Sequence, residues 1–465
     1  MNSFNKSFVY FISLVSAMGG LLFGYDWVVI GGAKPFYELF FHIADSPAQQ
    51  GWAMSAAILG CLIGAMVSGA LADRYGRKKL LIGSSVLFLI SAYYTGASTN
   101  FTMFVIARMI GGIGIGIASD LSPMYIAEVS PGAIRGKLVS LNQLTIVLGI
   151  LGAQTVNWLL AEPVPANFSA IDIVASWNGQ FGWRWMFWVE AIPAVLFFIL
   201  AFFIPESPRW LLVKGRVSEA SSILTRVGGS TYAEEEMNVI RRNLNTDKVK
   251  EPGVAGIHTL RSKQMRKVLI LGIVIAVFQQ WCGTNVIFNY AQEIFQGAGF
   301  TINDVMFNIV VTGVVNVIFT FVGIFIIDRL GRRPLILLGA GGLGVIYLIL
   351  GGCYFFHVSG WFMILLVVMA IACYAMTLGP VTWVLLSEIF PNRVRGIAMS
   401  IATFALWTGC FTLTYSFPLL NSALGSSGTF WIYTIICFIG YFFFLKNVPE
   451  TKGKSLETIE KELVK

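Results

Sequence analysis

Charged side chains are scarce in this chain. Asp, Glu, Lys and Arg make up 12% of its 465 residues, whereas soluble proteins carry about 25%. Hydrophobic residues make up 56% of the sequence, and no single soluble core could bury that much apolar surface. The shortage of charge therefore excludes a soluble globular protein and indicates a chain that spans a membrane.

Histidine and cysteine are also few. The three histidines are scattered over loops and helix ends, and the six cysteines all fall in apolar runs without the spacing of metal ligands. We interpret the cysteines as small buried hydrophobic residues. No metal or other cofactor is expected. An enzyme is not expected either, because the apolar segments contain no set of nucleophile and base.

Long apolar runs are what the chain has in abundance. About twelve of them approach 20 residues, the length that an α-helix needs to cross about 30 Å of hydrocarbon. The runs are continuous rather than alternating, which excludes a membrane β-barrel. We therefore predict an all-α integral membrane protein with twelve transmembrane helices. They are expected near residues 9–30, 51–72, 80–98, 101–122, 138–160, 185–204, 267–290, 305–327, 334–356, 361–386, 397–420 and 428–446.

The net charge of +8 follows membrane topology rather than nucleic acid binding. Lys and Arg crowd alternate loops such as 74–79, 206–267 and 329–333, while the opposite loops carry almost none, with Lys34 and Arg184 as exceptions. By the positive-inside rule both termini are expected in the cytoplasm. No small-residue cleavage site follows the first apolar run, which predicts an uncleaved first helix. We expect a monomer in the inner (cytoplasmic) membrane, with the lipid bilayer as its surroundings.

Short charged motifs occur twice, about half a chain apart. This pattern is typical of duplicated membrane bundles, which place a substrate site between their halves. We predict a six-helix bundle at 1–204, a cytoplasmic helical linker at 205–266, a second bundle at 267–447 and a cytoplasmic tail at 448–465. The linker could be a plain connector or a latch against the repeated motifs. The repeats pair 73–78 with 328–333, 205–209 with 449–453, and Glu128 and Arg135 with Glu388 and Arg395.

The repeated charges can form a salt-bridge network between helices on the cytoplasmic face. Such a network is bistable, because it forms when the inner gate is shut and breaks when the gate opens. The alternative is that these charges only orient the chain in the membrane. The candidate gating residues are Asp73, Arg74, Arg77, Glu128, Arg135, Glu206, Arg209, Asp328, Arg329, Arg332, Glu388, Arg395 and Glu450.

Several charges fall inside the apolar runs, where an unpaired charge costs several kcal/mol. Asp26 and Arg108 lie at similar depths in the first and fourth predicted helices, so they can pair. Protonation of Asp26 would compete with this pairing, which makes the pair a candidate for proton coupling rather than a static ion pair. Asp120 either lines a watered kink at Pro123 or reaches the cytoplasmic side. Glu190 is interpreted as a structural or gating partner.

The seventh predicted helix concentrates amide side chains. Amides donate and accept hydrogen bonds, as sugar hydroxyls do, and an aromatic face can pack against the C–H face of a sugar. The alternative is hydrogen bonding between helices with aromatic filler, which is common in membrane bundles. The candidate sugar-binding residues are Phe23, Gln143, Gln279, Gln280, Asn285, Asn289, Trp383 and Trp407.

These motifs resemble the sugar porter family of the major facilitator superfamily, nearest to bacterial D-xylose–proton symporters. The resemblance implies a secondary active transporter that imports a monosaccharide by proton symport and alternating access. The sugar would be a pentose such as xylose or arabinose, or a hexose. Asp26 and Arg108 match the family's proton-coupling pair. The likeness covers essentially the whole chain and rests on GGLLFGYD (19–26), DRYGRK (73–78), RMIGGIGIG (108–116), PESPRW (205–210), FQQWCGTN (278–285), DRLGRR (328–333), GPVTWVLLSEIFP (379–391) and VPETKGKSLE (448–457).

The chain also departs from the xylose symporters, so the resemblance does not determine which sugar is transported. Ile150 and Leu406 stand where those proteins have glutamine, and Asn289 stands where they have tyrosine. A facilitative uniporter of the same fold is the nearest alternative, although such carriers usually have asparagine at the position of Asp26. A membrane sugar sensor is a further alternative, but sensors of this type usually need a longer tail than 448–465.

Overall fold

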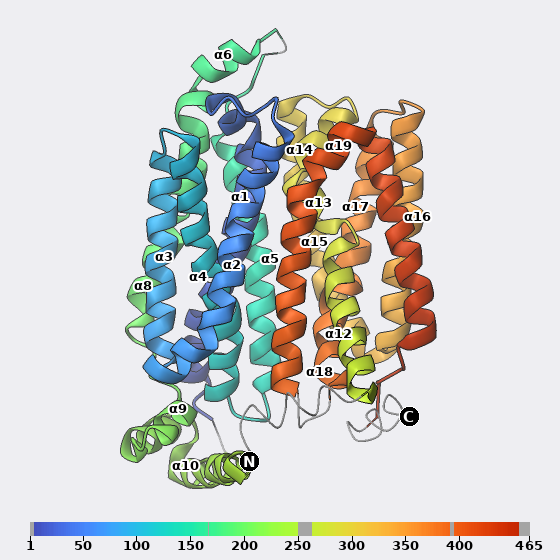
Figure 1. The fold of residues 1–465 in the computed structure, drawn as a ribbon. Coiled ribbons are helices and arrows are strands. Elements are labelled where there is room, and N and C mark those ends of the chain that lie inside the picture. Colours follow the sequence, from blue (N-terminus) through green and yellow to red (C-terminus); the bar gives the residue numbers. More distant parts are fainter. Residues whose placement is uncertain (1–3, 166, 250–262, 391–394, 455–465) are drawn as a thin grey trace. The chain divides into compact units, whose positions relative to one another are not determined.

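The structure is a computed structural model that describes residues 4–165, 167–249, 263–390 and 395–454. Within these ranges every regular element is a helix and no strand occurs (Figure 1), which confirms the predicted all-α fold. The first part of the chain forms α1 (Lys6–Phe40), α2 (Pro47–Tyr75), α3 (Arg77–Ala97), α4 (Phe101–Val129), α5 (Arg135–Leu160), α6 (Ala170–Ala175), the π-helix η1 (Asn178–Gly182), α7 (Trp183–Trp188), α8 (Ala191–Ala201), α9 (Pro208–Val213) and α10 (Val217–Val249). The second part forms α12 (Lys263–Trp281), α13 (Thr284–Asn289), α14 (Ala291–Gly297), α15 (Ile302–Leu330), α16 (Arg332–Phe355), α17 (Trp361–Met376), α18 (Leu378–Ile389) and α19 (Arg395–Asn447).

The helices are long enough to cross a membrane many times. Eleven stretches of the described chain have the length and apolar composition of membrane spans. The last stretch lies in α19, whose 53 residues would far exceed a hydrocarbon core of about 30 Å. Gly425 interrupts α19 with φ 69° and ψ 173°, so this stretch holds two spans. The structure is thus consistent with the predicted twelve.

Two basic residues that the sequence analysis assigned to loops lie in helices instead. Lys34 is expected beyond a first span that ends near residue 30, but α1 continues to Phe40 and includes it. The continuation buries Phe36 and Tyr37 completely, and this packing stabilises the extra turns. Arg184 lies in α7 and donates hydrogen bonds of 2.6 Å to the carbonyls of Gly96 and Ser98. It therefore satisfies carbonyls at the end of α3, where the helix dipole favours a cation.

The chain packs into two compact units. Unit 1 contains residues 1–27, 56–153 and 184–252, and unit 2 contains residues 28–55, 154–183 and 253–465. This division cuts through α1, α2 and α5. The late part of α1, the early part of α2 and the end of α5 therefore pack with the helices of the second part of the chain, inside unit 2. The units are defined by contact, so the division into sequence halves remains a prediction.

Glycines bring the helices of unit 1 into close contact. A Cβ atom at Gly60 of α2 would collide with the backbone of Met109 and would lie 2.9 Å from the Cα of Gly112 on α4. Gly64 and Gly116 repeat this arrangement further along the same two helices. Small residues at such positions let two helices approach closely, as is common in membrane bundles.

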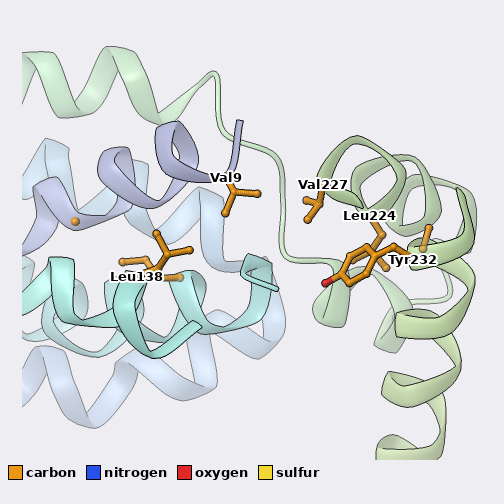
Figure 2. Close-up of a cluster of buried hydrophobic side chains, with 8 residues drawn as sticks. Val9, Leu138, Leu224, Val227 and Tyr232 are labelled. Atoms are coloured by element: carbon orange, nitrogen blue, oxygen red, sulfur yellow. The ribbon is translucent and has the colours of Figure 1, made fainter. Parts of the chain in front are cut away.

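The polar segment after α8 folds into α9 and α10 and is docked onto the membrane helices of unit 1. Figure 2 shows Leu224, Val227 and Tyr232 of α10 in the same buried cluster as Val9 of α1 and Leu138 of α5. The backbone N–H of Asn5 donates to the carbonyl of Val227 at 2.9 Å. The segment therefore packs onto α1 and α5 of unit 1. Whether it is a plain connector or a latch against the repeated motifs stays a prediction.

Candidate functional site

Asp26 and Arg108 form an ion pair inside unit 1. The Nη1 of Arg108 donates to the Oδ1 of Asp26, and its Nη2 donates to the backbone carbonyl of Asp26 at 2.9 Å. Their exposed fractions are 0% and 1%, so neither charge is solvated from outside. The Oδ2 of Asp26 has no hydrogen-bond partner among the described residues. The predicted pairing therefore occurs, and it leaves one carboxylate oxygen available to a proton.

Glu190 lies beside this pair. It is the N-cap of α8 and is buried, close enough to Asp26 and Arg108 for their charges to interact. Within the described chain both of its carboxylate oxygens lack a hydrogen-bond partner. Two carboxylates and one guanidinium carry an excess negative charge when all are ionised, and burial disfavours that charge. The interpretation of Glu190 as a structural or gating partner stays a prediction, and the fold places this carboxylate beside the Asp26–Arg108 pair.

Asp120 lies elsewhere in unit 1 and is tied to a neighbouring helix. Its Oδ2 accepts a hydrogen bond of 2.6 Å from the hydroxyl of Ser68 on α2. Ser68 is buried, so this contact joins α2 and α4 through polar side chains within apolar helices. Asp120 stands out in the sequence as a charge in an apolar run, but nothing in the spacing of α4 identifies Ser68 as its partner.

The amides of the predicted seventh helix come together where that helix breaks. It is not continuous: α12 ends at Trp281, α13 begins at Thr284, and Gly283 between them has φ 89°. The Nε2 of Gln280 donates to the Oε1 of Gln279 at 2.7 Å, and the Nδ2 of Asn285 donates to the Oε1 of Gln280. Broken helices of this kind form the substrate sites of many transporters.

The other candidate sugar contacts of unit 2 differ in exposure. Asn289 is buried, and its Oδ1 has no hydrogen-bond partner in the described part of the chain. Trp383 of α18 exposes 40% of its surface, whereas Trp407 of α19 is buried. Trp383 therefore presents a ring that a ligand could contact, and Trp407 does not in this conformation.

Gln143 and Phe23 belong to unit 1. Gln143 is exposed on α5, next to the buried Asn142. Phe23 packs edge to face against Trp27, with ring centroids 5.8 Å apart. Gln143 thus has a side chain free of the helix packing that holds its neighbour, as a ligand contact requires.

The first set of repeated charges forms a compact network in unit 1. Arg77 begins α3, and its guanidinium pairs with Asp73 at 3.2 Å and with Glu128 at 3.0 Å. The backbone N–H of Arg77 donates to Glu206 at 2.9 Å. Gly76 has φ 97°, and a Cβ there would collide with the Glu206 carboxylate. A carboxylate therefore caps the start of α3, where the helix dipole favours an anion.

The second set repeats this arrangement in unit 2. Arg332 begins α16, pairs with Glu388 at 3.1 Å and donates its backbone N–H to Glu450 at 3.0 Å. Gly331 has φ 94° and again leaves no room for a side chain beside the carboxylate. Burial tends to raise the pKa of Glu450, but backbone N–H groups, including those of Lys452, Arg332 and Arg333, outweigh it and lower the pKa. The sequence duplication therefore corresponds to a duplicated structural device.

The structure identifies the partners within the network. Glu128 of α4 contacts Arg77 of α3, and the Nη2 of Arg135 lies 3.9 Å from the Oε1 of Glu236 on α10. Spacing along the chain does not identify which neighbouring helix a side chain faces. Arg74 lies over the ring of Tyr75.

The remaining candidate gating residues are only partly placed. Arg209 lies in α9 and makes noncovalent contact with other residues of the chain. The backbone carbonyl of Arg329 accepts a hydrogen bond of 2.6 Å from Lys452. The side chains of Asp328 and Arg395 lie outside the described residues.

An all-α chain with these spans, a buried acid–arginine pair and an amide-bearing broken helix has the architecture of a secondary transporter of the major facilitator fold. A family model described as "Sugar (and other) transporter" matches residues 12–463. The chain therefore belongs to the sugar transporter family, whose members are transporters and not enzymes.

Curated relatives align with almost the whole chain. It is 39% identical over 464 residues to the arabinose-proton symporter of Bacillus subtilis (strain 168), covering 100% of this chain and 97% of that protein. It is 37% identical over 487 residues to the D-xylose-proton symporter of Escherichia coli (strain K12), covering 98% and 96%. The galactose-proton symporter of the same strain is 36% identical over 467 residues, covering 99% and 96%.

Solved structures agree with the fold. The xylose transporter of E. coli in a partially occluded inward open conformation matches with a TM-score of 0.84 and 35% identity, covering 97% of this chain and 100% of that chain. A structure of a proton:xylose symporter bound to 6-bromo-6-deoxy-D-glucose matches with a TM-score of 0.79 and 35% identity, covering 99% and 100%.

Proposed function

We propose that this protein imports a monosaccharide together with a proton by alternating access. The observation that carries the proposal is the buried Asp26, held by Arg108 through one carboxylate oxygen and lacking a hydrogen-bond partner within the described residues on the other. A proton on that oxygen would weaken the ion pair, and re-formation of the ion pair would expel the proton. The carboxylate can therefore bind a proton in one step of a cycle and release it in another.

The amide cluster of Gln279, Gln280 and Asn285 is the proposed binding site for the sugar hydroxyls. It offers donors and acceptors at the break between α12 and α13, and the exposed ring of Trp383 offers an aromatic face. The relatives are named as symporters of arabinose, xylose and galactose. We infer a pentose or a hexose as the substrate, with Gln143, Asn289, Phe23 and Trp407 as further candidate contacts.

The facilitative uniporter remains the alternative function. It would use the same fold and the same amides but would have no need of a buried carboxylate that exchanges protons. Asp26, Glu190 and Arg108 lie together, and this arrangement favours symport over uniport. No specific feature of the described residues favours a sensor.

We further propose that the protein works as a monomer in the inner membrane, with both termini in the cytoplasm. The concentration of Lys and Arg in alternate loops supports this orientation. The networks around Arg77 and Arg332 would then lie at the cytoplasmic ends of the helices. There they would stabilise the conformation in which the inner mouth is closed, and the halves 1–204 and 267–447 would move relative to one another.

The experiment that tests the proposal is uptake of labelled sugars into proteoliposomes with an imposed pH gradient, acidic outside. A panel of pentoses and hexoses competes with the label, which identifies the substrate. Symport predicts accumulation above the external concentration that disappears when the gradient is collapsed. The matched control is the Asp26→Asn variant. Equilibration without accumulation in the wild type would support the uniporter instead.

A further inference from the structure

A buried ion cluster joins α1 to α14, and the proposed proton and sugar sites do not use it. Lys34 of α1 is only 2% exposed. Its Nζ lies 2.9 Å from the Oε1 of Glu38, one turn later in the same helix, and it also pairs with Glu293 of α14. One ammonium group is thus shared between a carboxylate of its own helix and a carboxylate of another helix. All three residues belong to unit 2.

The surroundings hold the cluster in place. The Nζ of Lys34 lies 5.4 Å from the ring centroid of Tyr290, and the Tyr290 hydroxyl donates to the carbonyl of Thr414 at 2.7 Å. Gln50 of α2 donates to Glu38 at 3.3 Å and to the carbonyl of Ala44 at 2.7 Å. Glu38 is therefore fixed to the α1–α2 side of the cluster, independently of Glu293.

The backbones around the cluster are in close contact. A Cβ at Gly31 of α1 would lie 3.1 Å from the carbonyl oxygens of Phe288 and Asn289 on α13. The glycine lets α1 approach the backbone of α13 directly. Separation of α1 from α13 and α14 would break the Lys34–Glu293 pair but not the Lys34–Glu38 pair, since Glu38 moves with Lys34.

We propose that Lys34 is the centre of a two-partner latch that holds the outer mouth of the transporter closed. The assignment to the outer mouth rests on the proposed function and its topology. Glu293 is the partner across the mouth, and Glu38 is the partner that Lys34 keeps when α14 moves away. A buried ammonium without a partner would be very unfavourable, so Glu38 makes opening feasible while Glu293 makes closure stable.

This division of roles gives opposite signs to two chemically identical substitutions. Glu293→Gln removes the partner across the mouth and leaves a complete Lys34–Glu38 pair, so the population of the open state should rise. Glu38→Gln leaves Lys34 with Glu293 as its only carboxylate partner. Opening would then leave the ammonium unpaired, so the population of the closed state should rise. If the cluster were only structural filler, both substitutions would loosen the same packing and shift the equilibrium in the same direction.

The reporter is a cysteine placed at Ala291 on α14, a buried residue two positions before Glu293 and similar to cysteine in size. A membrane-impermeant maleimide is added from outside to right-side-out vesicles, and the labelling rate of Ala291→Cys is measured with and without each latch substitution. Protein that keeps alanine at this position gives the background from the native cysteines. We expect Glu293→Gln to raise the rate about tenfold or more and Glu38→Gln to lower it, because loss of one partner of a buried ion pair shifts an equilibrium strongly.

Lys34→Met, which leaves two carboxylates facing each other, should also raise the rate. If Glu293→Gln does not reach the membrane, Glu293→Asp keeps the charge but shortens its reach, and it should raise the rate by a smaller factor. Changes of the same sign for Glu38→Gln and Glu293→Gln, or no change in either, would overturn the latch. The assay needs neither sugar nor a proton gradient, so its outcome is independent of whether symport is correct.

Discussion

Arg108 holds Asp26 at two places, through the carboxylate oxygen Oδ1 and, at 2.9 Å, through the backbone carbonyl. The bond to the backbone does not depend on the charge of the carboxylate. Arg108 can therefore stay docked on α1 when Asp26 takes up a proton, and only the charge-assisted bond to the side chain changes. A site of this design can exchange a proton without losing its geometry.

The first prediction concerns Asp26→Asn. The amide keeps the size of the side chain and leaves the backbone contact intact, but it cannot bind and release a proton. Accumulation against a sugar gradient should be abolished, while exchange of labelled for unlabelled sugar across the membrane should persist. Uptake and exchange are measured on the same proteoliposomes. Full accumulation in this variant would rule out Asp26 as the coupling residue.

The second prediction concerns the amide cluster. A buried polar group that loses its partner costs about 1–3 kcal/mol, so Gln279→Ala and Gln280→Ala should each weaken sugar binding by roughly ten- to a hundredfold. Gln280 should have the larger effect, because it contacts both Gln279 and Asn285. Calorimetry gives the affinities. Asn308→Ala, a buried amide on α15, is the control that should bind normally; native affinity in both glutamine variants would refute the site.

The third prediction concerns the inner network. Arg77→Gln and Arg332→Gln each remove the side chain that contacts a glutamate of a neighbouring helix. We expect the population of the inward-facing state to increase. The rate of net transport should fall by a larger factor than the affinity for sugar. Accessibility of an introduced cysteine at the cytoplasmic mouth reports the state. The exposed Lys79→Gln is the control, and identical labelling of all variants and wild type would contradict a gating role.

The fourth prediction concerns the cap at Glu450. Hydrogen bonds from the backbone lower its pKa in the folded protein, so the ionised form contributes stability. That contribution is complete above the ordinary glutamate pKa of about 4.3 and is lost as the pH falls through the lowered native value. Glu450→Gln should lower the thermal midpoint at neutral pH, with an effect below about 1 kcal/mol because solvent screens this partly exposed carboxylate, and the difference from wild type should shrink in acid. A difference that stays constant with pH would count against this role.

Much of this architecture could be predicted from the sequence. Apolar runs of membrane length give the spans, because the bilayer imposes the length. The pairing of Asp26 with Arg108 could be predicted from depth alone, since a lone charge in hydrocarbon needs a partner. The duplicated motifs at Arg77 and Arg332 fold into the same helix cap because the same glycine and carboxylate recur.

Other features depend on tertiary packing that spacing does not encode. Lys34 lies inside α1 because buried aromatic residues extend that helix beyond the first apolar run. The break at Gly283 interrupts a run that reads as continuous, because one glycine with positive φ leaves the hydropathy unchanged. Glu190 joins Asp26 only through the fold. Ile150 and Leu406 are buried in separate units, and their influence on the choice of sugar remains a prediction.

Proton movement with sugar is the central claim, and external pH reports it most directly. The favoured sugar is added to a lightly buffered suspension of sealed vesicles that contain the protein and have no imposed gradient, while labelled sugar entry is recorded in parallel. Symport predicts that the external medium becomes more alkaline as sugar enters, and that Asp26→Asn abolishes this change. Sugar entry by the wild type with no change of external pH would contradict the account.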